Sequence, residues 1–205
     1  MNTLVYSIDK TENPTTLYVN LTNACTNNCV FCLREQKDDV CGKEMWLETE
    51  QISLEQIIEQ FNTFATPQQI VFCGYGEPSY RLDDAVYVAK RVKEKYPEIK
   101  IRINTNGQSD LILGEDSAPL YNDAFDTVSV SLNAPTPEKY QEICHSAYGI
   151  GALDAVITFA SNVKAYVSEV IFSVVREFIT EDEIEKCKKI SESTGVPLRI
   201  RDYIS

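Results

Sequence analysis

The sequence predicts an α/β protein, an open six-unit (β/α)6 partial TIM barrel with mostly parallel strands. Apolar runs of strand length alternate with amphipathic helical patterns from residue 17 onward. This alternation is typical of strands joined by right-handed helical crossovers, which build a parallel sheet covered by helices. The 205 residues suffice for one sizeable core, and six units fall short of the eight that close a TIM barrel. We expect a single domain, with a partial barrel over 17–205 after an N-terminal extension over 1–16.

The first unit begins with a strand over 17–21, preceded by a short strand over 4–8. It leads into a loop that holds Cys25, Cys29 and Cys32. Residues 34–50 are polar and are predicted to form an excursion before the first helix. Ser53 caps that helix, with Gln56 in the capping-box position.

The next two units each start with an apolar strand, over 69–73 and over 100–104. The first of these strands ends in Gly74-Tyr75-Gly76-Glu77-Pro78, and the helix after it stops before Pro97. The second ends in Thr105-Asn106-Gly107, and a loop or short helix continues to about residue 125.

The last strands are predicted over 127–132, 169–175 and 198–203. Helices lie between them, one starting at Thr136-Pro137 and one over 152–166. A third is capped by Thr180 with Glu183 and ends at Gly195.

Composition narrows the function classes. The net charge of −12 argues against broad binding to a nucleic acid backbone. No apolar run approaches the roughly 20 residues of a membrane span, and the N-terminus lacks a signal-peptide pattern. We therefore expect a cytoplasmic protein without a membrane partner. Seven cysteines in a reducing compartment indicate metal binding or packing.

Strand alternation predicts which side chains line the barrel interior. If Ile101 and Ile103 face the helices, Arg102 and Asn104 face inward. The same reasoning turns these further residues inward: Ser129, Ser131, Asn133, Arg199, Arg201 and Tyr203. Interior arginines indicate a pocket for carboxylate or phosphate, or ion pairs inside the barrel, and the sequence leaves both open.

The three clustered cysteines predict a soft metal centre. Three thiolates leave a coordination position free, whereas a zinc site needs a fourth ligand, for which Cys41 is the candidate. The Cys25-x3-Cys29-x2-Cys32 spacing resembles the cluster loop of the radical S-adenosylmethionine (radical SAM) enzymes. The resemblance implies that these cysteines hold a 4Fe–4S cluster whose open iron binds SAM. Phe31 matches the family's aromatic residue before the last cysteine.

Further motifs extend the resemblance over most of the chain. Gly74, Tyr75, Gly76 and Glu77 resemble the family's Gly-Gly-Glu-Pro motif, although Tyr75 stands in place of its first glycine. The resemblance implies cofactor contacts by these residues and by Phe31, Asn106 and Val175. Because strand alternation turns them inward, Asn104, Ser131 and Asn133 are further candidates for cofactor contacts, and Arg176, just past a strand, is a candidate for an anionic group of the cofactor. Taken together, the motifs look like the small TatD-associated radical SAM proteins.

The resemblance implies reductive cleavage of SAM to a 5′-deoxyadenosyl radical. The inward side chains of Arg102, Arg199, Arg201 and Tyr203 predict that this radical acts on a small, anionic substrate bound by them. Two alternatives are an activase that makes a radical on a partner protein and a non-catalytic iron–sulfur redox or regulatory module. An electron donor such as flavodoxin or ferredoxin and a functional link to a TatD-type hydrolase are expected. Cys73, Cys144 and Cys187 are expected to pack in the core, and His145 to cap a helix or lie on the surface.

Overall fold

The computed structural model describes residues 2–9, 11, 13–36, 39–40 and 42–203. Its centre is a seven-stranded sheet with the order β1-β2-β5-β6-β7-β8-β9. The strands are β1 (Val5–Tyr6), β2 (Thr16–Val19), β5 (Gln69–Phe72), β6 (Lys100–Thr105), β7 (Thr127–Ser131), β8 (Glu169–Val175) and β9 (Leu198–Arg201). All neighbours pair in parallel except β1, which runs antiparallel to β2. The sheet is an open partial barrel, as the sequence predicts.

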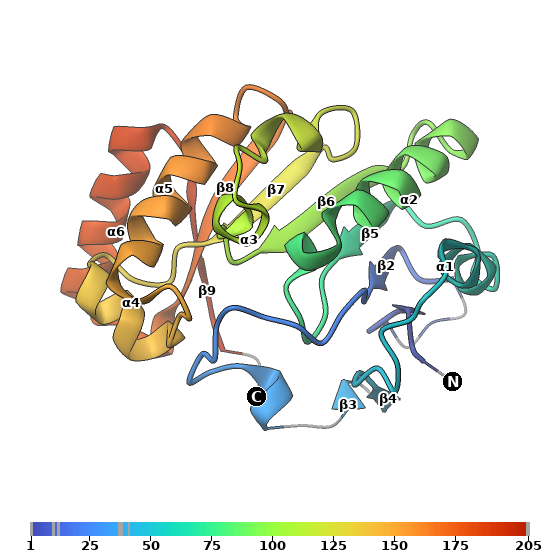
Figure 1. The fold of residues 1–205 in the computed structure, drawn as a ribbon, viewed down its shortest axis with the longest axis horizontal. Coiled ribbons are helices and arrows are strands. Elements are labelled where there is room, and N and C mark those ends of the chain that lie inside the picture. The colour runs from blue at the N-terminus through green and yellow to red at the C-terminus, as the bar shows by residue number, and fades with distance from the viewer. Residues whose placement is uncertain (1, 10, 12, 37–38, 41, 204–205) are drawn as a thin grey trace.

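Helices connect the parallel strands and cover one side of the sheet (Figure 1). They are α1 (Leu54–Phe61), α2 (Leu82–Lys95), α3 (Ser109–Leu113), α4 (Pro137–Cys144), α5 (Ala152–Val163) and α6 (Glu181–Thr194), with 3-10 turns η1 (Leu33–Glu35), η2 (Pro78–Arg81), η3 (Ala118–Tyr121), η4 (Gly149–Gly151) and η5 (Arg176–Phe178). Both predicted capping boxes form, at Ser53 with Gln56 and at Thr180 with Glu183.

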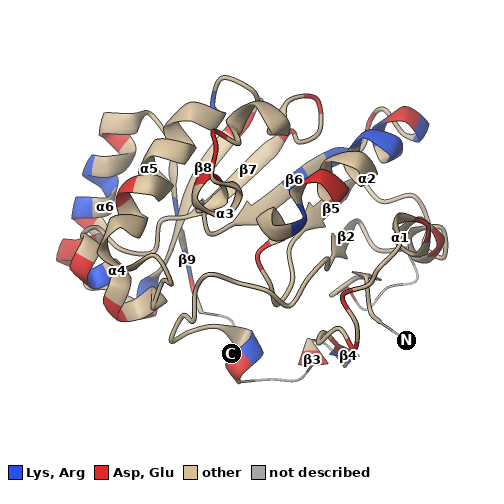
Figure 2. Cartoon of the chain, in the orientation of Figure 1, with Lys and Arg blue, Asp and Glu red and all other residues tan. Residues whose placement is uncertain are grey.

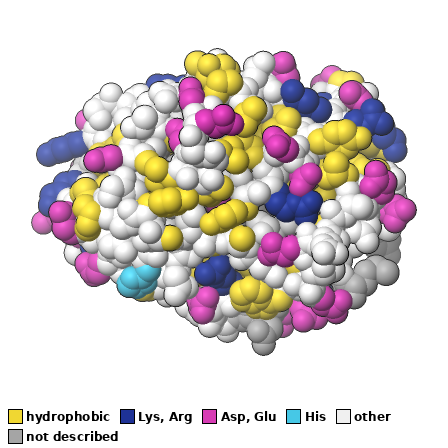
Figure 3. Space-filling view, in the orientation of Figure 1, with side chains coloured by type: hydrophobic (Ala, Val, Ile, Leu, Met, Phe, Trp, Pro, Cys, Tyr) yellow, Lys and Arg dark blue, Asp and Glu magenta, His cyan; other side chains and the backbone are white. Residues whose placement is uncertain are grey.

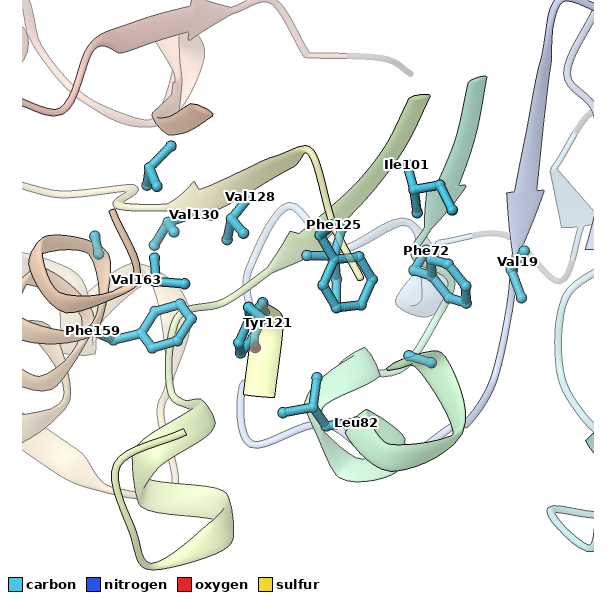
Figure 4. Close-up of a cluster of buried hydrophobic side chains, with 14 of the residues drawn as sticks. Val19, Phe72, Leu82, Ile101, Tyr121, Phe125, Val128, Val130, Phe159 and Val163 are labelled. Carbon is cyan, nitrogen blue, oxygen red and sulfur yellow. The ribbon is translucent and has the colours of Figure 1, made fainter. Parts of the chain in front are cut away.

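The core lies between the sheet and these helices. Val128 and Val130 of β7 are completely buried and face the helical layer, where Phe159 of α5 and Tyr121 of η3 meet them (Figure 4). Alternation on β7 therefore sends its apolar side chains to the helices, as predicted, and leaves Ser129 and Ser131 to the other side of the sheet.

The excursion between β2 and α1 has structure of its own. A two-stranded sheet forms there from β3 (Asp39–Val40) and β4 (Lys43–Glu44). Met45, Tyr6 and Tyr75 make a small apolar cluster beside it, and Trp46 packs edge-on to Tyr75 at 5.4 Å. The sequence predicted none of this pairing, because two-residue strands carry no periodic pattern. Cys41 lies outside the described residues.

Among the described residues, no single helix is long and apolar enough to cross a membrane. Only the two segments Pro137–Cys144 and Gly149–Val163 together have that length and apolar composition, and a bend of 109° separates them. The only histidine, His145, is exposed and ends α4 in a left-handed conformation with φ 45°, so the expected surface and capping role is confirmed (Figure 3).

Candidate active site

The cysteine loop runs from the end of β2 across to α4 (Figure 1). Backbone hydrogen bonds hold it at both places. On one side the Glu77 N–H donates to the Ala24 carbonyl at 2.8 Å. On the other the Asn28 and Val30 N–H groups donate to the carbonyls of Cys144 and Ile143, each at 2.9 Å. The loop is thus positioned by two elements that follow it by tens of residues in the sequence.

The thiols of Cys25, Cys29 and Cys32 are all free and partly exposed. Burial, followed by the nearby Glu77 carboxylate, raises the pKa of the Cys25 thiol to about 12. Burial also raises the pKa of Cys32. A bound metal would reverse this effect, because its positive charge deprotonates a coordinating thiol. In the described part of the chain no three His, Cys, Asp or Glu side chains lie close enough to hold a single ion.

Glu77 joins the cysteine loop to the end of β6. Its buried carboxylate accepts hydrogen bonds from the Ser79 hydroxyl and the Thr105 hydroxyl, both at 2.7 Å, and from the Asn106 N–H at 2.6 Å. Burial raises the pKa of Glu77, while these hydrogen bonds act in the opposite direction. The carboxylate therefore fixes the turn between β5 and η2 from inside the protein.

The two glycines before Glu77 face the cysteine loop. A Cβ atom at Gly76 would lie 2.3 Å from the Thr22 carbonyl oxygen, and one at Gly74 would lie 2.1 Å from the Asn20 side-chain oxygen. These glycines are needed because the first residues of the loop pack directly on them. Tyr75, between them, points into the apolar cluster with Tyr6 and Met45.

A buried polar network stands behind the loop. The Asn106 amide donates to the Thr26 hydroxyl at 2.7 Å and approaches Cys25 Sγ at 4.0 Å. The Gln108 side chain donates to Asn27 at 2.9 Å and to the Tyr140 hydroxyl at 2.9 Å. Sequence reasoning missed Gln108 and Tyr140, because neither stands in a recognisable motif. Asn106 lies at the loop, as a residue that orders it.

The concave face of the sheet carries the predicted polar row. Arg102 and Asn104 lie on β6, and the Arg102 Nε donates to Asn104 at 2.7 Å. The register aligns Ser131 with Ser173, Ser173 with Arg199, and Val175 with Arg201. Figure 2 shows basic residues on both β6 and β9, with two strands between them. Three arginines thus share one face of the sheet.

Among the described residues, the attraction from the Glu169 carboxylate on the same face does not outweigh burial and mutual repulsion at these arginines. Burial first, and then repulsion from Arg199, lowers the pKa of Arg102, and burial with repulsion from Arg199 and Arg102 lowers the pKa of Arg201. Within the described ranges no acidic side chain forms an ion pair with any of the three. Arg201 Nε is buried and has no hydrogen-bond partner among the described residues. Arg199 is exposed to solvent. The interior ion pairs that the sequence left open therefore do not form between the residues that the structure describes.

Aromatic side chains connect the cysteine loop to the end of β9. Phe31 packs on Phe178 with 5.0 Å between the ring centroids, and Phe178 packs edge-on to Tyr203 with 5.4 Å between the ring centroids. The Tyr203 hydroxyl also hydrogen bonds to Gln36. No role was predicted for Phe178 from the sequence, because a 3-10 turn produces no hydrophobic periodicity.

Arg176 is placed differently from the other predicted arginines. Its side chain is about half exposed, and it pairs with Glu181 at 3.0 Å and with Asp202 at 3.8 Å. Its neighbour Val175 is buried.

The residues present fit an iron–sulfur cluster with a polar cofactor beside it. The three partly exposed thiols on one loop are the donor set that such a cluster takes. Asn133 Oδ1 and Arg201 Nε lie at the carboxyl ends of β7 and β9, and both are buried polar atoms without a hydrogen-bond partner in the described part of the chain. In parallel α/β folds this edge is where ligands bind. The fold and the site therefore define an open parallel barrel with a three-thiol loop at its ligand-binding edge.

The comparison with protein families agrees with that class. The model of the Radical SAM superfamily matches residues 19–189. The chain belongs to the Radical SAM superfamily, whose enzymes use a 4Fe–4S cluster and SAM. The TatD-associated subgroup is not shown by these comparisons.

Two curated relatives are named as a probable GTP 3′,8-cyclase and a GTP 3′,8-cyclase. The chain is 28% identical to a probable GTP 3′,8-cyclase of Thermococcus kodakarensis over 187 residues, 91% of this chain and 56% of that protein. It is 27% identical to the GTP 3′,8-cyclase of Limosilactobacillus fermentum, over 68% of this chain and 40% of that protein. The chain thus spans about half the length of the curated relatives it matches.

Solved structures share the fold. Streptococcus suis SuiB bound to S-adenosylmethionine superposes with a TM-score of 0.64 at 16% identity, covering 95% of this chain and 40% of that one. Native anSMEcpe with bound AdoMet superposes with a TM-score of 0.62 at 18% identity. The match covers 92% of this chain and 52% of that one.

Proposed function

We propose that this chain cleaves SAM reductively and directs the resulting radical at a small substrate with several negative charges. The observation that carries the substrate class is the set of three arginines on one face of the sheet that form no ion pair among the described residues. Membership of the Radical SAM superfamily supports the reaction class.

The cofactor part of the proposal assigns roles to residues at the carboxyl edge. Cys25, Cys29 and Cys32 would hold the cluster. Phe31 and the backbone of Gly74–Glu77 would border SAM, with Asn104, Ser131, Asn133, Val175 and Arg176 as further contacts. Bound there, the cluster and SAM supply the electron transfer that yields methionine and a 5′-deoxyadenosyl radical. The chain's own task is to hold these groups in place and to keep competing reactants out.

The substrate part follows from charge. Arg102 and Arg201 are partly buried, and each carries a charge that the other and Arg199 repel. Desolvated like charges are costly unless an anion lies between them. A single carboxylate neutralises one of them, whereas a phosphate chain offers several charges and bidentate acceptors for guanidinium groups. We therefore favour a phosphorylated substrate, and the two cyclase relatives, named for GTP, support that choice.

The reaction is tested by anaerobic reconstitution with iron and sulfide, reduction with dithionite in the presence of SAM, and chromatography for 5′-deoxyadenosine. Wild type should form the nucleoside and Cys29→Ala should not. Cys187→Ala is the matched control, because Cys187 is a buried thiol on α6, away from the loop. A cluster that forms without SAM cleavage would favour the non-catalytic redox module.

The substrate class is tested by titrating inorganic tripolyphosphate into the reconstituted protein. Arg201→Gln should weaken binding by tenfold or more, which corresponds to about 1.4 kcal/mol. Arg91→Gln, on an exposed arginine of α2 paired with Glu94, should leave it unchanged. Equal binding by the two variants would refute the arginine site. Absence of tripolyphosphate binding in wild type would turn the search toward a protein substrate and the activase alternative.

Three finer expectations remain predictions. They are an electron donor such as flavodoxin or ferredoxin, a functional link to a TatD-type hydrolase, and a cytoplasmic location. Purification of the chain from its own cells under anaerobic conditions, with identification of what accompanies it, tests the first two.

A further inference from the structure

Cys144 ends α4 directly against the cysteine loop. It is completely buried. The two backbone hydrogen bonds from Asn28 to the Cys144 carbonyl and from Val30 to the Ile143 carbonyl lie on either side of Cys29. They hold the backbone of Cys29 against that of Cys144, although 115 positions separate the two residues in the sequence.

The side chains of the two cysteines also interact. Cys29 packs against the buried cluster that contains Cys144, and interaction with the Cys144 thiol, followed by burial, raises the pKa of Cys29. On its other side the Cys144 sulfur accepts a hydrogen bond from the Asn133 side-chain nitrogen at 3.4 Å. Asn133 therefore fixes the Cys144 sulfur where it faces Cys29. Both thiols are free.

The other loop cysteines have different surroundings. The Cys25 sulfur accepts from the Asn27 N–H at 3.4 Å and lies near Asn106. Cys32 follows Cys29 in a turn in which its N–H donates to the Cys29 carbonyl at 2.9 Å. Sequence spacing alone would favour a Cys29–Cys32 pair. The structure instead gives Cys29 a thiol neighbour from α4, in a contact fixed on both sides by backbone hydrogen bonds.

We propose that Cys144 is the oxidation partner of Cys29, so that loss of the cluster in the presence of an oxidant produces a Cys29–Cys144 disulfide. The two S–H groups lose two protons and two electrons, an S–S bond forms, and dioxygen is reduced to hydrogen peroxide. A disulfide needs Cα atoms about 4.4–6.8 Å apart, and adjacent backbones joined by hydrogen bonds approach to such distances. The inference rests on the proposed function, since Cys29 is a proposed cluster ligand.

The consequence is a reversible block of one ligand position. While the disulfide persists, only two of the three thiols can take iron. The bond also protects Cys29 from oxidation to sulfinic acid, which thiol reductants do not reverse. Thiol–disulfide exchange with a dithiol reductant restores both thiols and the ligand set.

The experiment starts from reconstituted protein that loses its cluster in air. Free thiols are alkylated, and the chain is cut with trypsin without reduction. Cleavage after Lys10, Arg34, Lys139 and Lys164 gives a peptide over 11–34 with all three loop cysteines and a peptide over 140–164 whose only cysteine is Cys144. The expected product is the cross-linked pair of these peptides, with fragmentation assigning the bond to Cys29.

The outcomes are distinct. A disulfide within peptide 11–34, or sulfinic acid at Cys29 with Cys144 alkylated, would overturn the inference. In Cys144→Ala we expect at least threefold more irreversible oxidation at Cys29 than in wild type, and less iron uptake after dithiothreitol. Cys187→Ala should behave as wild type. The wild-type peptide map decides the inference even if Cys144→Ala folds poorly. A chain that forms the disulfide but never takes up a cluster would refute the proposed function and leave the disulfide standing.

Discussion

Replacing Gly76 by alanine should displace the cysteine loop. The new Cβ would lie 2.3 Å from the Thr22 carbonyl oxygen and 2.7 Å from the Ala24 carbonyl oxygen, whereas ordinary van der Waals contacts begin at 3.4 Å. The backbone of Thr22 would have to retreat by about 1 Å, and backbone has no rotamer with which to avoid the contact. The Glu77 N–H donates a hydrogen bond to the Ala24 carbonyl at 2.8 Å, and such a shift would pull the two groups apart.

The expected loss of stability combines two terms. Overpacking of a tight contact costs about 1–3 kcal/mol. Loss of one buried backbone hydrogen bond adds about 1 kcal/mol. We therefore expect the free energy of unfolding to fall by about 2–4 kcal/mol. Because Cys25 follows Ala24 directly, iron uptake should fall below half that of wild type.

Gly151→Ala is the matched control, because a Cβ atom there meets no atom of the described residues within 4 Å and the φ of Gly151 is −71°. Urea unfolding monitored by circular dichroism gives the stability, and iron and sulfide per chain give the uptake after anaerobic reconstitution. Gly76→Ala with the stability and iron content of Gly151→Ala would show that the loop does not pack on Gly76 as described.

Three further perturbations test the site and the fold. Glu77→Gln puts an amide NH2 against either the Asn106 N–H or the Ser79 N–H. The free energy of unfolding in urea should therefore fall by about 2 kcal/mol. The control Glu98→Gln, on an exposed side chain, should leave that free energy unchanged. Phe159→Ala empties a fully buried ring position and should cost about 3–5 kcal/mol by the same measurement. Hydrogen bonds from Thr180 lower the pKa of Glu183, so its contribution is present above the unfolded pKa and is lost as pH falls through the folded pKa. Glu183→Gln should therefore flatten the acid side of the stability profile, and an unchanged slope would contradict the capping assignment.

The fold was largely readable from the sequence because its signals are local. Val128, Val130 and Leu132 alternate with Ser129 and Ser131. This two-residue period predicts the strand and also which side chains lie on each of its faces. Two helix N-termini were predicted from capping boxes, in which hydrogen bonds join residues only three positions apart: Ser53 with Gln56, and Thr180 with Glu183. The cysteine spacing lies within one loop, so its chemistry was also visible.

Only the tertiary structure decided what meets the loop. Cys144, Gln108 and Tyr140 reach it from segments remote in sequence, and no local pattern marks such contacts. The inward direction of Arg102 followed from alternation, but whether an acidic partner neutralised it depended on the packing of every strand around it. The sequence determined the periodicities, the caps and the ligand spacing. Tertiary packing determined which buried groups found partners, because hydrogen bonds and ion pairs join residues that are near in space and can be remote in sequence.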